Sequence, residues 1–288
     1  MQARRVRAFT LVELPGVSRC KRAAFTLVEL LVVIGIIAVL IGILMPVLGR
    51  ARDQANKTAC MSNMRQVMLA FMQYANANKD KCPFGARLDN PGGVDLPEDW
   101  VHWRTGINNE GLWSSSIAPY LGGKGEGLRN ILRCPSDRGE DRITSTTGQY
   151  NYSYTMNMYF EPRDGYFPAA GGPAVRLSTT KRASEKILLA EENERTINDG
   201  FWAPGNYVGD VVPPAGADPT TGWVVNWDWL SIRHDNSKKE ADPPSSTGPL
   251  DALPNLGRKG NVCFADGHVD FVSRKFAHSP QYLMPRVP

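Results

Sequence analysis

The sequence predicts an α+β fold in which one long N-terminal helix packs on a small antiparallel β head with long loops. Three observations predict it. Residues 30–48 are nineteen consecutive residues without a charged or strongly polar side chain. Apolar residues then continue at helical spacing to about residue 78, and beyond that point Gly, Pro and Asn break the chain into short segments of strand composition.

The apolar run is long enough to cross a membrane. A helix rises about 1.5 Å per residue, so nineteen residues nearly match a hydrocarbon core of roughly 30 Å. Glu29 lies just inside the N-terminal edge of this run, where an isolated membrane helix disfavours a charge. We therefore expect a single-pass membrane helix whose Glu29 has a partner.

The basic charge is concentrated before this helix. Residues 1–24 contain six Lys and Arg and one acid, so the remainder holds 33 − 6 = 27 basic and 29 − 1 = 28 acidic residues. A nearly neutral remainder gives no support to a nucleic-acid partner. By the positive-inside rule, the basic leader stays cytoplasmic and the C-terminal region is exported, in a compartment that permits disulfides.

The junction between leader and helix carries a recognisable motif. Lys21-Arg22 and Ala23-Ala24 precede Phe-Thr-Leu-Val-Glu-Leu at residues 25–30. Here the chain resembles the type IV pilin and type II secretion pseudopilin family, at the site where a prepilin peptidase cuts and methylates the new N-terminus. The resemblance implies cleavage between Ala24 and Phe25, although the family usually has Gly in place of Ala24.

The same resemblance gives a role to the carboxylate in the apolar run. Glu29 would be the fifth residue of the mature chain and would pair with the N-terminal amine of a neighbouring subunit, which makes a buried charge tolerable. Pro46 also falls where the family commonly has a helix-kinking proline.

The same hexapeptide, Phe-Thr-Leu-Val-Glu-Leu, also occurs at residues 9–14, sixteen residues before the copy at 25–30. Pro15-Gly16 follows it, so a spanning helix is not expected to continue from this copy. We interpret it as a decayed duplication or part of an extended leader, in preference to a working alternative cleavage site.

An apolar stripe predicts that the helix continues beyond the membrane. Residues at steps of four and three are Cys60, Met64, Val67, Phe71 and Tyr74. The predicted organisation is a basic leader (1–24), a transmembrane and assembly helix (25–48), its amphipathic continuation (49–79) and an exported globular head (80–288).

The head contains several predicted short elements. We expect a short helix at 113–120, strands at 150–160, 186–190 and 222–232, an exposed loop at 235–259, and a hairpin of 261–264 with 268–272 around Asp266-Gly267. Glu191-Glu192 would be a solvated strand end, in preference to metal ligands or acid–base groups.

The C-terminal region also carries a resemblance. Arg233-His234, a gap, and then Asn-Val-Cys-Phe-Ala-Asp-Gly-His-Val at 261–269 are similar to prepilin-type proteins with an "H-x9-DG" signature, abundant in planctomycete-like bacteria. The segments at Cys60 and Cys134-Pro135-Ser136-Asp137 also resemble that group. Here 31 residues separate His234 from Asp266, so 235–259 is interpreted as an insertion.

The residues of the head suggest a metal site, for which two interpretations are possible. His234, Asp266 and His268 form a candidate metal site, and oxygen ligands together with the calcium binding known in heads of major secretion pseudopilins favour Ca²⁺. The alternative, which we favour, is that Asp266-Gly267 only makes the turn.

The four cysteines after the leader allow three pairings. We favour Cys60–Cys134, which would tie the helix to the head, and Cys82–Cys263 would then remain.

The predicted function is architectural. The sequence contains no G-x-S-x-G, H-E-x-x-H, P-loop or C-x-x-C signature, so we do not predict an enzyme. The resemblance implies a structural, pseudopilin-like subunit of a type II secretion or type IV pilus-like filament at the inner membrane, with its head periplasmic. Its partners would be prepilin peptidase, other pilin or pseudopilin subunits and the inner-membrane assembly platform. The alternative is a pilin-anchored exported enzyme or glycan-binding ectodomain, with a pocket near the tryptophans of residues 223–229.

Overall fold

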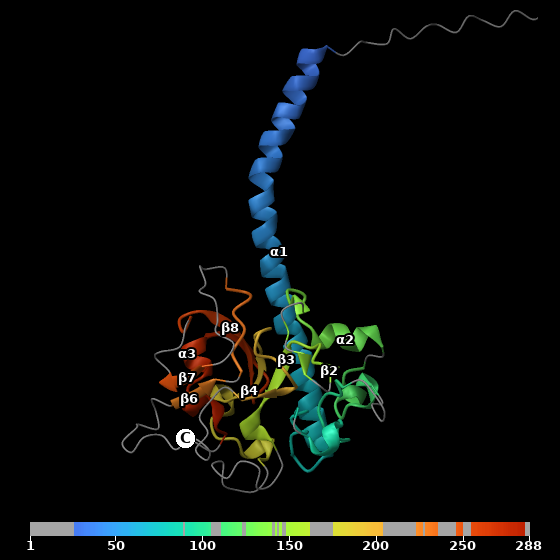
Figure 1. Cartoon of the computed structure of the whole chain (residues 1–288), viewed down its shortest axis with the longest axis vertical. Helices are drawn as coiled ribbons and strands as arrows, with labels where there is room; N and C mark the ends of the chain where they lie inside the picture. Colours follow the sequence, from blue (N-terminus) through green and yellow to red (C-terminus); the bar gives the residue numbers. More distant parts are fainter. Residues whose placement is uncertain are drawn as a thin grey trace, which may run out of the picture. The chain divides into compact units, whose positions relative to one another are not determined.

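The structure of the chain is a computed structural model (Figure 1). It describes residues 26–88, 90–104, 111–122, 125–139, 142, 144–145, 148–161, 175–203, 223–226, 228–235, 246–249 and 255–285. The chain divides into two compact units, Met1–Gly49 and Arg50–Pro288. The predicted α+β class is confirmed, with a long N-terminal helix and a small five-stranded sheet.

Helix α1 (Leu27–Ala77) is continuous over 51 residues and contains Pro46. Its first half provides the one segment, among the described residues, that is long and apolar enough to cross a membrane. An 18-residue window there has a mean hydropathy of 3.1 and none of it is buried. Such a helix has no apolar surroundings of its own, so a bilayer or a neighbouring protein must supply them.

The second half of α1 is a core helix of the head. The predicted stripe is confirmed, because Cys60, Met64, Val67 and Phe71 are buried. The Phe71 ring lies 5.5 Å from that of Trp100. Burial of one helical face is what the spacing of four and three residues requires.

The sheet has the order β5-β3-β4-β8-β9. Its strands are β3 (Tyr154–Asn157), β4 (Ile187–Glu191), β5 (Phe201–Trp202), β8 (Lys259–Phe264) and β9 (Val269–Ser273). Three of its four strand pairs are antiparallel, as expected for the head, and one pair differs, since β5 pairs with β3 in parallel. The chain reverses between β4 and β5, and because β4 is antiparallel to β3, that reversal makes β5 parallel to β3.

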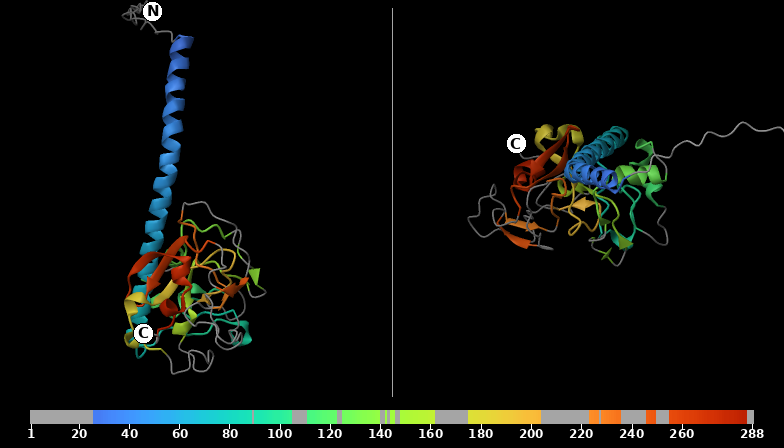
Figure 2. Two further views of the ribbon diagram at one scale, coloured as in Figure 1. Left: turned by 90° about the vertical axis from the view of Figure 1, so that its left-hand side faces the viewer. Right: turned by 90° about the horizontal axis from the view of Figure 1, so that it is seen from above.

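Apolar clusters cover both faces of the sheet. Side chains alternate along a strand, so Cys263 of β8 joins the cluster of α1, whereas Val262 and Phe264 pack with the C-terminal helices. Strand β9 lies beside α1 (Figure 2), with the Lys57 Nζ 3.3 Å from the centroid of the Phe271 ring.

The predicted C-terminal hairpin is confirmed, because β8 and β9 pair antiparallel. The remaining elements are 3-10 turns η1 (Pro91–Gly93), η2 (Leu112–Ser114), η3 (Ala118–Tyr120), η5 (Met158–Phe160), η7 (Leu177–Thr179) and η8 (Ala183–Glu185), helices α2 (Glu126–Leu132), α3 (Arg274–Ala277) and α4 (Pro280–Leu283), and strands β1 (Thr144–Ser145), β2 (Gly148–Gln149), β6 (Trp223–Asn226) and β7 (Ser246–Pro249).

Four predicted segments differ from the structure. Of the strand expected at 222–232, only Trp223–Asn226 (β6) is a strand, and the other described residues form one isolated bridge, between Leu230 and Glu192. The helix expected at 113–120 is two 3-10 turns, since Pro119 lacks the N–H that a continuous helix needs. The strand expected at 150–160 ends at Asn157, whose side chain caps a 3-10 turn by accepting from the Tyr159 N–H. The loop expected at 235–259 contains β7, which pairs with β6 despite its Ser-Thr-Gly-Pro sequence.

Candidate functional site

The N-terminus of α1 is closed by a capping box between Thr26 and Glu29. The Thr26 backbone N–H and hydroxyl donate to Glu29 Oε2 at 2.9 and 2.8 Å, and the Glu29 N–H donates to Thr26 Oγ1 at 3.2 Å. These bonds satisfy N–H groups that a helix start leaves unpaired. The pattern Thr-x-x-Glu is a sequence signal for this cap that the sequence analysis missed. Ala24 and Phe25 lie outside the described residues.

The apolar face around Glu29 has no packing partner among the residues that the structure describes. Nearly every large side chain from Leu27 to Leu48 is about half exposed or more, for example Leu27 at 74% and Met45 at 69%. A surface of this size needs a bilayer or other helices. The structure thus combines one carboxylate with a continuous apolar helix. In the pilin and pseudopilin family that the sequence resembles, this combination serves the assembly of subunits.

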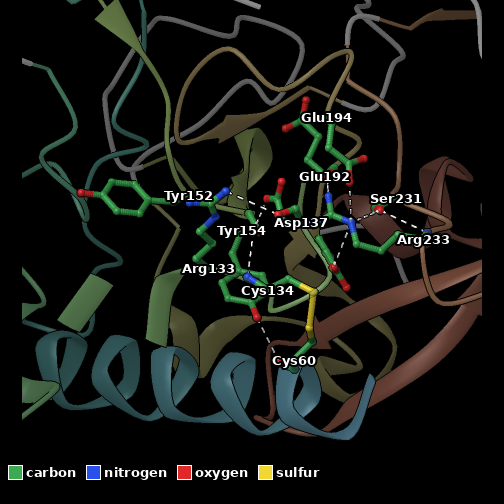
Figure 3. A network of polar contacts seen from close by, with 12 residues as sticks. Cys60, Arg133, Cys134, Asp137, Tyr152, Tyr154, Glu192, Glu194, Ser231 and Arg233 are labelled. Atoms are coloured by element: carbon green, nitrogen blue, oxygen red, sulfur yellow. Dashed lines mark hydrogen bonds and ion pairs between the residues drawn. A yellow bond between two sulfur atoms is a disulfide. The ribbon is translucent and has the colours of Figure 1, made fainter. Parts of the chain in front are cut away.

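In the head, Cys60 of α1 and Cys134 form a disulfide whose Cα atoms are 5.1 Å apart. The two residues are separated by 74 positions, so the bond ties α1 to the turn at Cys134-Pro135-Ser136-Asp137 (Figure 3). The backbone N–H of Cys134 donates to Ser153 Oγ at 2.8 Å. The disulfide therefore lies at the edge of a polar network, not in isolation.

Asp137 is the carboxylate at the centre of that network. Its Oδ2 accepts from Ser153 Oγ and Arg142 Nη2, and lies 3.2 Å from Arg233 Nη1. Burial by itself would raise the pKa of Asp137, but Arg233, Arg142 and the Ser153 hydrogen bond outweigh burial and lower the pKa below its ordinary value. Asp137 is therefore held ionised.

Arg233 connects this turn to the end of β4. Its Nε lies 3.3 Å from Glu191 Oε1 and 3.1 Å from Glu194 Oε1, and its Nη2 donates to the Glu192 carbonyl at 2.6 Å. Burial disfavours its charge, yet Glu191, Glu194 and Asp137 raise its pKa above the ordinary value. A planar guanidinium with five donors can serve several acceptors in this way.

His234 lies beside the disulfide. Its Nε2 is 3.2 Å from Cys134 Sγ and 3.4 Å from Glu191 Oε1, and all three residues are buried. Among the described residues, Cys60, Cys134, Glu191 and His234 form the one cluster of three or more metal-ligand side chains whose ligand atoms lie within 4.8 Å of one another.

The ligand set predicted from His234, Asp266 and His268 is not brought together. Asp266 and His268 contact each other in the β8–β9 turn, where Asp266 Oδ1 accepts from the His268 N–H at 3.1 Å and lies 2.6 Å from His268 Nδ1. The His268 ring also stacks on Phe264, with centroids 4.2 Å apart. Gly267 has a φ of +97°, so these contacts are those of a turn.

The expectation of a solvated Glu191-Glu192 is wrong. Both residues are fully buried, because β4 is a central strand of the sheet and the chain beyond it folds back on its end. Glu192 Oε1 accepts from Thr196 Oγ1 at 3.0 Å. Burial first, and then the charges of Asp228 and Asp199, raise the pKa of Glu192 well above its ordinary value.

The remaining pairing, Cys82–Cys263, is also wrong, because both cysteines are free and buried. Cys263 sits in β8, whereas Cys82 follows α1 between the isolated bridges Lys81↔Arg176 and Phe84↔Asp99. Both thiols lie in the apolar cluster that packs on α1, but the structure does not join them. Burial raises the pKa of Cys82 to about 12 and raises that of Cys263 as well, so neither is a reactive thiolate.

A cavity of about 810 Å³ opens beside the Asp137 network, because Arg133, which lines it, donates to the Asp137 carbonyl at 3.4 Å. Its lining includes the aromatic residues Trp103, Trp113 and Tyr152 and the basic residues Arg129 and Arg133. Trp113 is 69% exposed. The predicted pocket near 223–229 falls largely on side chains outside the described residues, and Trp229 is buried.

Comparisons with known proteins agree with the N-terminal motif. The family described as "Prokaryotic N-terminal methylation motif" matches residues 19–45, and "Protein of unknown function (DUF1559)" matches residues 49–126. No curated protein and no solved structure matches the chain. Together the two family matches support a pilin- or pseudopilin-like protein, and the methylation motif indicates one that a prepilin peptidase processes.

Proposed function

Because the chain carries a prokaryotic N-terminal methylation motif, we propose that it is a structural subunit of a type II secretion or type IV pilus-like filament. Prepilin peptidase would cut between Ala24 and Phe25 and methylate Phe25. The mature subunit would then be assembled with other pilin or pseudopilin subunits on the inner-membrane platform, with its head on the periplasmic side. Its role is mechanical, without bond chemistry of its own.

The observation that carries this proposal is the exposed apolar half of α1 with Glu29 at its start. Packing one helix surface on a different surface of the next subunit generates an open helical filament. Both Thr26 bonds end on Glu29 Oε2. Within the described chain, Oε1 is therefore left for a neighbour's N-terminal amine, so the helix cap and the intersubunit ion pair can coexist.

Mass spectrometry of the mature N-terminus tests the proposal. We expect a chain that begins with methylated Phe25 when prepilin peptidase is present and an uncut chain when it is absent. A chain that retains Met1 in the presence of the peptidase, or that begins at Phe9, would contradict the proposal, since Glu29 would no longer be the fifth residue.

A second candidate function is favoured by the cavity in the head. Its Trp113 is exposed and its lining combines aromatic rings with Arg129 and Arg133, a combination suited to a ring-bearing anionic ligand such as an acidic saccharide. Titration of the full chain with uronate and neutral oligosaccharides tests this candidate. The candidate is supported if uronate oligosaccharides bind saturably and Trp113→Ala abolishes that binding. It is rejected if neither the uronate nor the neutral oligosaccharides bind.

A further inference from the structure

We propose that the head binds one zinc ion when Cys60 and Cys134 are reduced, through both thiolates, His234 Nε2 and Glu191 Oε1. The four ligand atoms already lie within 4.8 Å of one another, and all four residues are buried. They come from α1, the turn that begins at Cys134, the end of β4 and the segment after Leu230. Two thiolates, one imidazole and one carboxylate are ligands that zinc accepts at a tetrahedral site.

The distances fit a tetrahedron. Zinc lies about 2.3 Å from sulfur and about 2.0–2.2 Å from nitrogen and oxygen, which sets ligand–ligand edges of roughly 3.3–3.8 Å. Cys134 Sγ and His234 Nε2 are 3.2 Å apart, and His234 Nε2 and Glu191 Oε1 are 3.4 Å apart. The two sulfur atoms, which are bonded in the disulfide, must separate on reduction, and the remaining ligand atoms, all within 4.8 Å of one another, need only small shifts to reach these edges.

Glu191 is oriented as a ligand. Its Oε2 accepts from Asn261 Nδ2 at 2.8 Å, while its buried Oε1 accepts no hydrogen bond from the described residues and faces His234. A ligand carboxylate held through its other oxygen is the usual arrangement around protein-bound metals.

The charges also balance. Zinc with two thiolates and one carboxylate carries a net charge of −1. The Arg233 Nε lies 3.3 Å from Glu191 Oε1, and its positive charge makes the buried group neutral. When the disulfide is present, Glu191 and Arg233 neutralise each other, so neither state leaves an unpaired buried charge.

The disulfide and the zinc site exclude each other, because the same sulfur atoms serve both. A phosphine reductant gives two electrons to the disulfide and takes an oxygen atom from water, whose two protons convert the sulfurs to thiols. Each thiol then loses its proton to solvent when it binds zinc. In the reverse direction, a disulfide oxidant takes two electrons from the two thiolates and two protons from solvent to become two thiols, the Cys60–Cys134 bond forms, and zinc is released.

Cobalt substitution tests the site directly. The full chain in mild detergent would be reduced with a water-soluble phosphine, freed of reductant without oxygen, and titrated with Co²⁺ and then Zn²⁺. We expect one equivalent of Co²⁺ with a thiolate-to-cobalt charge-transfer band and intense tetrahedral d–d bands, all displaced by Zn²⁺. The absence of these bands, or equal bands in the oxidised chain, would overturn the proposal.

Variants assign the ligands. His234→Ala should lose the tetrahedral spectrum, whereas Cys82→Ala should retain it, because Cys82 is buried but lies outside the cluster. Unchanged cobalt binding in Cys134→Ser would reject the site.

A wild-type measurement does not depend on whether the variants fold. If zinc holds both thiolates, it should slow alkylation of Cys60 and Cys134 in the reduced chain by about tenfold or more, since bound thiolates are poor nucleophiles. An unchanged alkylation rate in saturating zinc would rule out the site.

Discussion

The Arg233 guanidinium lies 3.2 Å from the Asp137 carboxylate and so joins two segments that are far apart in the chain. Asp137 ends the Cys-Pro-Ser-Asp turn, and Arg233 precedes His234. The ion pair holds the Cys-Pro-Ser-Asp turn against the Arg233-His234 segment. Both motifs therefore lie at one place in the fold, beside the disulfide and the end of β4.

Asp137→Asn should destabilise the head by about 3 kcal/mol, because Arg233 and Arg142 would lose a buried ionised partner. The pKa of Asp137 is lowered in the folded protein, so its stabilisation is present above the unfolded pKa of about 3.9 and is lost as pH falls through the folded value. Denaturant unfolding of the full chain, followed by tryptophan fluorescence, should show the two proteins converging on acidification.

Glu185→Gln is the matched control for this variant. Glu185 pairs with Arg182 at the surface, where the two side chains are 37% and 58% exposed, so its loss should change stability by less than about 0.5 kcal/mol. Equal losses in the two variants would show that the Asp137 network contributes no more than a surface pair.

Glu192→Gln should flatten the alkaline side of the stability profile. Glu192 has a raised pKa because it is buried beside Asp228 and Asp199. Its stabilisation is therefore present below the unfolded pKa of about 4.3 and is lost as pH rises toward the folded value, at up to about 1.4 kcal/mol per pH unit for one proton. We expect the variant to match wild type near pH 5 and exceed it near pH 8, in the same unfolding assay. A parallel decline of both proteins would contradict this assignment.

Replacing Cys60 and Cys134 together by Ser should cost about 2–5 kcal/mol under oxidising conditions, since the disulfide closes a loop with a sequence separation of 74. Cys82→Ala removes a free buried thiol and serves as the control for side-chain loss alone. The free energy of unfolding of both variants and of wild type would be measured with and without reductant. Only the proteins that retain the disulfide should be destabilised by reductant, and this difference gives the contribution of the disulfide.

Gly267→Ala should destabilise the head by more than about 1 kcal/mol. Gly267 has a φ of +97°, and an added Cβ would lie 2.8 Å from Met72 Cε of α1. At Gly257 an added Cβ would meet nothing within 4 Å, so Gly257→Ala should be close to neutral. Similar thermal midpoints for both variants would refute a structural role for the Asp-Gly turn.

Glu29→Gln separates the two roles proposed for this residue. A Gln at this position can still complete a capping box with Thr26, but it cannot form an ion pair with a neighbour's amine. We expect normal membrane insertion and cleavage with filament assembly lost, as in Glu29→Ala. Filaments of normal abundance from Glu29→Gln would show that the charge is not required.

Local patterns were sufficient for a large part of the fold. The apolar run, the stripe from Cys60 to Phe71 and the Asp266-Gly267 turn each reflect interactions between residues close in sequence, so α1 and the β8–β9 hairpin could be predicted. The parallel β5 could not, because strand direction depends on how the chain reverses between elements.

The sequence by itself determined the membrane-spanning helix, with Glu29 at its start and a basic leader before it, because hydrophobic length and charge placement are properties of a continuous segment. Only the tertiary structure decided that Glu191 is buried beside Arg233 and that His234 faces Cys134 rather than Asp266. The partners of these side chains lie far away in the chain, and folding alone brings them within a few ångströms.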